Sequence, residues 1–262
     1  MLRIMKIIIF LAATFLIPLS ASFATDPYED TAENLAHQEE TNREAPNFKS
    51  RNGTWTYAFE LMLADGSSQV LSESNRNLLV KPASTMKIFT GWYAFKENFR
   101  KNSYVGQMLK QSVNSMASAT FNAMGGAKSL KAFYAQEGLV LNNSNHIQAD
   151  GSGLSYENKS HCGAQIKLLK MIYLDPSYDE FKALMARPGE EGTMKSRLPS
   201  LRGKLFAKTG TLKRTASLTG FVETKAGTVV FCVLSDYLPS AAANFRPRID
   251  AMVLKNISAL GY

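Results

Sequence analysis

Segments with the alternation and composition of β-strands lie near both ends of this 262-residue chain, and the part between them has a helical pattern. The strands are predicted over residues 55–63, 69–72, 205–209, 216–223 and 228–235. Residues of about 83–190 are largely helical, and a last helix is expected over 241–260. Strands from both ends can share one sheet only if those ends come together. We therefore expect an α+β fold, with a five-stranded antiparallel sheet flanked by helices and a mainly helical subdomain.

The first 24 residues have the pattern of an export signal. Arg3 and Lys6 precede an apolar run, Pro18 interrupts that run, and small residues at Ser22 and Ala24 suit a cleavage site. The alternative is a transmembrane anchor, but the unbroken run is short of the roughly 20 residues that a membrane span needs. We expect cleavage after Ala24, export, and no stable membrane anchor.

Residues 25–52 are predicted to be a polar, acidic tether that precedes a domain over residues 53–262. The tether holds seven of the 22 acidic residues, so the domain is more basic than the net charge of +8 for the whole chain indicates. A positive surface suits anionic partners such as cell-wall carboxylates, lipid headgroups or nucleic acid. An exported protein meets the first two more often, and no nucleic-acid-binding signature occurs in the sequence, so no nucleic-acid partner is expected.

The cysteines and histidines help mainly by arguing against certain kinds of catalytic site. Cys162 and Cys232 can form a disulfide in an oxidising compartment or remain as buried thiols, and two cysteines make no metal site. His37, His146 and His161 are scattered, and neither a His-Glu-x-x-His nor a Gly-x-Ser-x-Gly motif occurs. This pattern argues against zinc hydrolysis and a Ser-His-Asp triad, and implies no metal or cofactor.

A serine and a lysine three residues apart are the first candidates for catalysis. Pro82 is expected in the first turn of a helix that runs to about Phe99, which places Ser84 and Lys87 on one face. A serine hydroxyl needs a neighbouring base to take its proton, and a helix N-terminus adds positive potential. Serine-x-x-lysine alone also fits a helix start with a surface lysine, so companion motifs must decide.

Two companion motifs follow in order along the chain. Ser112 and Asn114 flank Val113 after a helical stretch, and they supply a hydroxyl that can relay a proton and an amide that can hold both Lys87 and a substrate amide. Residues 208–211 read Lys-Thr-Gly-Thr at the end of a predicted strand, where an edge backbone can pair with an extended peptide. Each motif is weak alone, but the three in this order are strong evidence for one site.

With these motifs the chain resembles the penicillin-binding protein 4 type of D-alanyl-D-alanine carboxypeptidase and endopeptidase, the class C low-molecular-mass group within the β-lactamase and DD-peptidase superfamily. The resemblance rests on four segments, namely Pro-Ala-Ser-Thr-Met-Lys at 82–87, Asp-Gly-Ser-Gly-Leu-Ser at 150–155, Gly-Thr-Met-Lys-Ser-Arg at 192–197 and Ala-Lys-Thr-Gly-Thr-Leu at 207–212. It implies a periplasmic serine DD-peptidase that acts on peptidoglycan stem peptides and is inhibited covalently by β-lactam antibiotics.

The resemblance also implies roles for the motif residues. Ser84 attacks the carbonyl carbon of the penultimate D-alanine with Lys87 as its base, and the N–H groups of Ser84 and Thr211 stabilise the oxyanion. The remaining expected site residues relay protons, orient the peptide or attract its carboxylate. They are Ser112 as proton relay, Asn114 and Thr209 as peptide-orienting groups, Gly210 in the peptide-pairing strand and Lys208 as positive charge.

One departure from the family's pattern affects substrate binding. Only 24 residues, 88–111, separate Lys87 from Ser112, where the family usually carries two large accessory domains. Their absence from this interval leaves open how the stem peptide is gripped, and predicts a more open cleft that admits bulkier, crosslinked peptidoglycan.

Two alternative functions remain. A serine β-lactamase needs rapid deacylation, normally by a glutamate in a Glu-x-x-Leu-Asn loop, and the nearest match at 137–142 is one residue too long. A catalytically inactive peptidoglycan-binding module is the other alternative, and it is disfavoured because every chemical group of the motif set is present.

Overall fold

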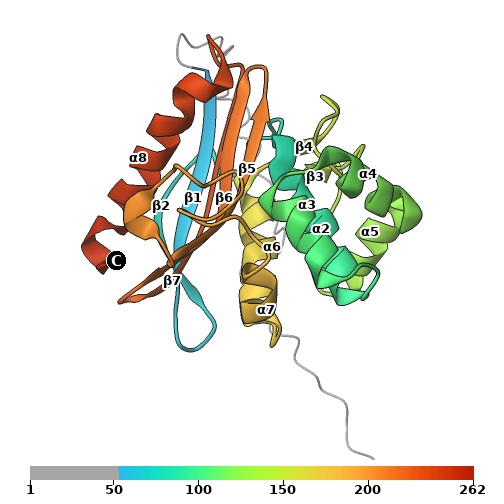
Figure 1. Cartoon of the computed structure of the whole chain (residues 1–262), viewed down its shortest axis with the longest axis horizontal. Coiled ribbons are helices and arrows are strands. Elements are labelled where there is room, and N and C mark those ends of the chain that lie inside the picture. The colour runs from blue at the N-terminus through green and yellow to red at the C-terminus, as the bar shows by residue number, and fades with distance from the viewer. Residues whose placement is uncertain (1–52) are drawn as a thin grey trace, which may run out of the picture. The chain divides into compact units, whose positions relative to one another are not determined.

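The computed structural model describes residues 53–262, and a five-stranded antiparallel sheet lies at their centre (Figure 1). The predicted export signal, 1–24, and the acidic tether, 25–52, lie outside the described residues. Within the described part, every helix is too short or too polar to cross a bilayer.

The sheet joins strands from the two ends of the described chain, as the strand pattern predicted. Its strands are β1 (Thr54–Met62), β2 (Ser68–Ser74), β5 (Leu205–Leu212), β6 (Thr215–Thr224) and β7 (Gly227–Asp236). The strand order is β2-β1-β7-β6-β5, and every neighbouring pair is antiparallel. The predicted fold class is therefore confirmed. The order also makes β5 an edge strand.

Strand β7 is buried on both faces, which explains its nearly continuous apolar sequence. Because side chains alternate along a strand, Val230, Cys232 and Leu234 face one hydrophobic cluster, and the intervening Phe231 and Val233 face the other. The first cluster includes buried side chains of the helical part, and the second includes those of helix α8 (Arg246–Ile257). Figure 1 shows α8 on one side of the sheet and the other α-helices on the opposite side.

The helical part is more divided than its sequence pattern indicated. Its helices are α2 (Lys87–Lys96), α3 (Asn102–Lys110), α4 (Asn114–Ala123), α5 (Gly126–Gln136), α6 (Cys162–Leu174) and α7 (Tyr178–Lys182). A small two-stranded sheet of β3 (His146–Ile147) and β4 (Lys159–Ser160) interrupts them. Strands of two residues are too short to produce a readable alternation, so sequence analysis missed this sheet.

Helix α2 is the central helix of this part. Trp92 is fully buried, and its ring packs edge-on against Phe181 of α7 with centroids 4.9 Å apart. Ile88 and Phe89 are buried in the same cluster. Burial on nearly all sides fixes the direction of α2, and with it the position of the first turn of the helix, which carries Lys87.

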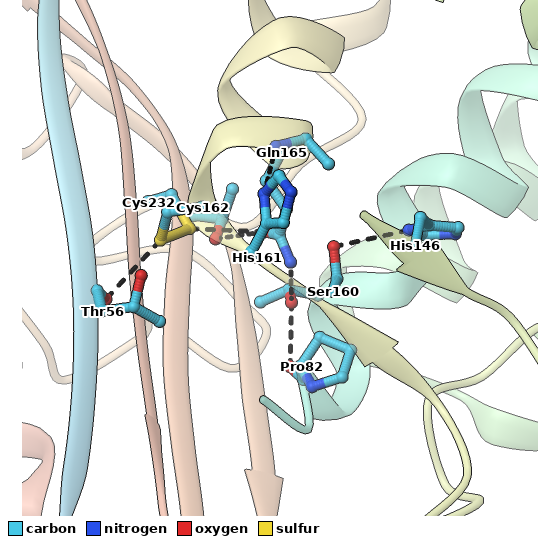
Figure 2. Close-up of a disulfide and its surroundings, with 11 residues drawn as sticks. Thr56, Pro82, His146, Ser160, His161, Cys162, Gln165 and Cys232 are labelled. Atoms are coloured by element: carbon cyan, nitrogen blue, oxygen red, sulfur yellow. Dashed lines mark hydrogen bonds between the residues drawn. A yellow bond between two sulfur atoms is a disulfide. The ribbon is translucent and has the colours of Figure 1, made fainter. Parts of the chain in front are cut away.

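A disulfide settles the question that the two cysteines left open. Cys162 at the start of α6 is bonded to Cys232 in β7, with the two Cα atoms 5.4 Å apart (Figure 2). The bond fastens the helical part directly to the middle of the sheet. Both cysteines are fully buried.

Candidate active site

Ser84 and Lys87 lie within hydrogen-bond distance of each other, although the turn that carries them differs from the predicted helix. Residues Ala83–Met86 form a single 3-10 turn, and α2 begins only at Lys87. Pro82 precedes this turn, and Ala83 has a φ of +51°, a left-handed conformation that a continuous α-helix excludes. The Lys87 Nζ lies 2.9 Å from the Ser84 Oγ. We call residues 82–86 the nucleophile turn.

Lys87 is fully buried and makes three polar contacts. Its Nζ donates to the Asn114 Oδ1 at 2.7 Å and to the Ser152 carbonyl oxygen at 2.6 Å, besides the contact with Ser84. Burial lowers the pKa of Lys87 to about 8, and the charge of Asp150 opposes this shift in part. A neutral amine has two N–H donors and one lone pair. The Asn114 and Ser152 oxygens can only accept, so the lone pair of neutral Lys87 is left for the Ser84 hydroxyl.

Ser112 and Lys208 form a second pair. The Lys208 Nζ donates to the Ser112 Oγ at 2.8 Å and to the carbonyl oxygen of Thr209 at 2.9 Å. Burial lowers the pKa of Lys208 well below its usual value, and the positive charge of Lys87 lowers it further. Ser112 has a φ of +59°, which is uncommon for a serine and is a form of strain often found at functional sites.

The Lys-Thr-Gly-Thr segment lies in β5, whose outer edge is free beyond Ala207 among the described residues. Ala207 pairs through both its backbone groups with Ala186 on that edge. Because both backbone polar groups of every second residue point the same way, those of Thr211 also point outward, away from β6. The Thr211 Oγ1 accepts a hydrogen bond from exposed Arg246 at 3.3 Å. Thr209 is almost buried, and no hydrogen bond of its side chain joins it to either lysine.

Gly210 allows β5 to approach the nucleophile turn. A Cβ at this position would lie 2.8 Å from the Pro82 carbonyl oxygen and 3.1 Å from the Ala83 Cβ. Only a residue without a side chain fits there. The glycine of the motif thus brings the strand backbone beside Ser84.

The loop at 150–155 supplies groups that sequence analysis did not assign. The Asp150 carboxylate accepts backbone N–H bonds from Ser152, Gly153 and Ser155, at 2.6 to 2.7 Å. Burial alone raises the pKa of Asp150, but these N–H donors lower it below its usual value. The folded loop presents the Ser152 carbonyl to Lys87, and a Cβ at Gly153 would overlap the Ala83 carbonyl oxygen. The segment was visible as a likeness to the family, but a role for a main-chain oxygen leaves no signature in side chains.

A buried chain of hydrogen bonds supports this loop from α2. The Thr90 hydroxyl donates to the Gly151 carbonyl oxygen at 2.9 Å, and the Gln148 amide nitrogen donates to the Thr90 Oγ1 at 2.9 Å. The Gln148 oxygen lies 3.0 Å from the His146 Nε2, which must therefore be the protonated ring nitrogen. Burial lowers the pKa of His146 to about 4, so its ring stays neutral at physiological pH. His161 accepts a bond from the Ala164 N–H and caps α6. Both histidines have structural roles.

Comparison with protein families gives one match. The model of the D-Ala-D-Ala carboxypeptidase 3 (S13) family matches residues 102–256, which is more than half of the chain. Ser112, Asn114 and Lys208 lie inside the matched range, and Ser84 and Lys87 precede it. No curated protein matches the sequence.

Solved structures of two kinds are similar to this chain. Penicillin binding protein 4 of Haemophilus influenzae in complex with a β-lactam is 24% identical over 61% of this chain and 41% of its own, with a TM-score of 0.54. A predatory peptidoglycan endopeptidase of Bdellovibrio bacteriovorus, Bd3459, is 26% identical over 61% of this chain and 43% of its own, also with a TM-score of 0.54. The TLA-1 extended-spectrum β-lactamase is 16% identical over 86% of this chain and 97% of its own, with a TM-score of 0.64. The chain thus spans about two fifths of the length of the first two proteins. Its likeness to the first and to the third concerns the fold alone.

Proposed function

The chain belongs to the D-Ala-D-Ala carboxypeptidase 3 (S13) family, and from this membership we propose that it is a periplasmic serine DD-peptidase. It cleaves D-Ala-D-Ala ends, D-Ala-diaminopimelate crosslinks, or both, in peptidoglycan stem peptides through an acyl-enzyme. β-Lactam antibiotics are its covalent inhibitors. Residues 1–24 act as a cleaved export signal, which delivers the domain to the compartment of its substrate.

The contacts of Lys87 carry this proposal. The buried amine has a pKa of about 8, so a useful fraction is neutral near physiological pH, and its lone pair is available to the Ser84 hydroxyl. As the Ser84 Oγ bonds to the carbonyl carbon of the penultimate D-alanine, its proton moves to the Lys87 Nζ. The developing oxyanion accepts N–H bonds from Ser84 and Thr211.

Collapse of the tetrahedral intermediate breaks the C–N bond. Ser112 gives its proton to the leaving amine and takes up in its place the proton that Lys87 received from Ser84, and the neighbouring Lys208 supplies positive potential. Asn114 and Thr209 orient the peptide along β5, whose outward backbone groups pair with it. Water then attacks the acyl-enzyme, releases the shortened stem peptide and returns the proton to Ser84.

Two observations oppose the alternative of a β-lactamase. The glutamate in the segment most similar to a deacylation loop, Glu137, directly follows α5, and the three hydrogen bonds of Lys87 do not involve it. Among the described residues, the acid whose charge acts on Lys87 is Asp150, and its oxygens accept hydrogen bonds from backbone N–H donors. An inactive binding module is opposed by the complete set of contacts around Ser84.

The test is the mass of the penicillin adduct followed over time. The intact protein should gain one penicilloyl group, Ser84→Ala should gain none, and the adduct should persist far longer than a turnover on nitrocefin. Undiminished labelling of Ser84→Ala would refute the assignment of the nucleophile. A short-lived adduct with sustained nitrocefin hydrolysis would identify a β-lactamase, and a wild type that gains no adduct would identify a binding module.

A further inference from the structure

Gln165 lies at the junction of the sheet, helix α6 and the nucleophile turn, and none of the catalytic motifs includes it. Its side chain is almost completely buried, with 1% exposure. A buried amide that lacks partners is costly, so its contacts show what it holds. Figure 2 shows the Gln165 side chain above Pro82, close to the Cys162–Cys232 disulfide.

The hydrogen bonds of Gln165 form a chain with a single possible direction. The Thr219 hydroxyl of β6 donates to the Gln165 Oε1 at 2.7 Å, and the Gln165 Nε2 donates to the Thr85 Oγ1 at 3.0 Å. The Thr85 hydroxyl in turn donates to the Pro82 carbonyl oxygen at 2.8 Å. The last group can only accept, so each proton in the chain has one place.

The nucleophile turn is the part of the site that needs such support. Ala83 holds a left-handed φ of +51°, and strained backbone persists only where its surroundings fix it. The Pro82 carbonyl that ends the chain is also the group against which Gly210 packs. The Gln165 chain therefore fixes the Pro82 carbonyl, which lies between the nucleophile turn and β5. The distance from Ser84 to the β5 backbone sets the geometry of the proposed oxyanion site.

The disulfide lies beside the part of this chain that joins Gln165 to Thr219. Cys162 precedes Gln165 by three residues on α6 and so lies on the same face of the helix. Cys232 is directly opposite Thr219 in the β6–β7 register. The Cys232 Sγ also lies 3.8 Å from the Gln165 Oε1. The bond between the two cysteines thus holds α6 and β6 at the separation that the Gln165 amide spans.

We propose that Gln165 is a positioning residue for Ser84, held at its working distance by the Cys162–Cys232 disulfide. The inference rests on the proposed function, because it concerns acylation at Ser84. Gln165 touches no reacting atom. It acts through Thr85 and Pro82 on the geometry of the nucleophile and the oxyanion site.

The test measures acylation of the full-length protein by a fluorescent penicillin over a range of concentrations, which separates the acylation rate constant from the dissociation constant of the initial complex. Gln165→Met keeps length and burial but removes both hydrogen bonds. We expect its acylation rate constant to fall about tenfold, with little change in the dissociation constant, because a small misplacement of a nucleophile slows the chemical step. Thr219→Val should act in the same direction, and Thr219→Ser, which keeps the hydroxyl, should restore the wild-type rate.

The control is Thr120→Val in α4. Thr120 is also fully buried, but within residues 53–262 its hydroxyl has no hydrogen-bond partner and so no hydrogen bond to the nucleophile turn. Its acylation rate constant should equal that of the wild type. The pH dependence of acylation should be unchanged in Gln165→Met, because the contacts of Lys87 remain.

The disulfide is tested by coupling. The double variant Cys162→Ser, Cys232→Ser should have a lower acylation rate constant than the wild type. Adding Gln165→Met to it should lower the rate constant no further, because the disulfide and the Gln165 hydrogen bonds act on the nucleophile turn as a single support. Wild-type rates in folded Gln165→Met and Thr219→Val, with only a lower Tm, would overturn the inference. If Gln165→Met does not fold, Thr219→Val and its serine control decide. A wild type that takes up no penicillin would overturn the proposed function as well, so the two failures are distinct.

Discussion

At the scale of single residues, the protonation state of Lys87 decides whether it can act as a base. Lys87 can serve as a base only when it is neutral, and burial brings its pKa down to about 8. Two of its three contacts are to oxygens that cannot donate, so loss of the proton costs neither of those bonds. Its surroundings therefore prepare Lys87 for the role of base that we propose for it.

The first prediction concerns the pH dependence of acylation. The rate constant for penicillin acylation should rise with pH through about 8 and level off above it, because the neutral form of Lys87 accumulates as the proton leaves. Stopped-flow labelling at constant ionic strength measures this profile. A flat profile between pH 6 and about 9 would contradict Lys87 as the base.

The second prediction changes the charge beside this amine. In Asn114→Asp, a carboxylate replaces the amide oxygen 2.7 Å from the Lys87 Nζ and favours the ammonium form. The profile should move to higher pH by roughly one unit or more, and acylation at pH 7 should slow by about tenfold or more. Asn114→Ala is the control, because it removes the contact without adding charge and should not move the profile upward. An unshifted profile in Asn114→Asp would show that another group sets the pH dependence.

The side chains of the proposed site were recognisable in the sequence, but its main-chain groups were not. Ser84, Lys87, Ser112, Asn114 and Lys208 were recognisable because a motif names residue types at fixed spacings. The Ser152 carbonyl was not, because any residue has one. The full burial of Lys87 was equally invisible, since it depends on a loop 63 residues further along that folds over α2.

At the scale of elements, the distance between β5 and the nucleophile turn depends on one missing side chain. A Cβ at Gly210 would meet the Pro82 carbonyl at 2.8 Å, so the strand and the turn could not both keep their places. Strand and turn come from opposite ends of the domain. Their contact is therefore a tertiary property that no local pattern reports.

The third prediction substitutes this glycine. Gly210→Ala should lower stability by about 1–3 kcal/mol through overpacking and should slow acylation in the folded protein, because the oxyanion N–H of Thr211 moves away from Ser84. Gly106→Ala in α3 is the control. Its Cβ would have 3.4 Å to the nearest atom, and helix propensity predicts a gain of about 0.5–1 kcal/mol with unchanged acylation. Thermal unfolding and labelling rates measure both, and normal acylation in Gly210→Ala would show that the approach is not needed.

Element boundaries were predicted well where a sequence pattern was long, and poorly where a strained backbone conformation sets the boundary. The strands of the large sheet agree with the structure because their alternating or continuously apolar patterns extend over many residues. The helix expected from Pro82 to about Phe99 is instead a 3-10 turn followed by α2, which ends at Lys96. Ala83 and Asn98 both have positive φ. Asparagine adopts this conformation comparatively often, but alanine rarely does, so the sequence does not indicate the turn at Ala83.

At the scale of the whole molecule, charge and cleft shape bear on the substrate. Residues 53–262 contain 25 lysines and arginines and 15 acidic residues, a net charge of +10. The interval between Lys87 and Ser112 is filled by the rest of α2 and by α3, with no inserted domain beside the site. A net positive charge favours binding to a large anionic polymer, and an interval without an inserted domain favours a bulky substrate over a small soluble peptide.

The fourth prediction follows from these two features. Incubation with intact sacculi should convert crosslinked dimers to monomers, with soluble pentapeptide trimmed less efficiently, because the crosslinked strand has room beyond the scissile bond. Raising the salt concentration should slow the reaction on sacculi, since screening weakens attraction to the wall. Chromatography of muropeptides measures it, with Ser84→Ala as the control. Surviving dimers together with trimmed pentapeptides would identify a plain carboxypeptidase.

The strand order of the sheet also constrains the order in which its strands can pair during folding. Strand β1 has its long partner in β7, about 170 residues later, so the first strand must wait for nearly the whole chain before its second edge is paired. Closing so long a loop is entropically costly and slows folding. Strand β5 in turn reaches the rest of the sheet only through β6 and β7. A nascent chain that already carries Ser84 and Lys87 therefore lacks β5 beside them, and the proposed site is complete only when the last strand, β7, inserts at the centre of the sheet.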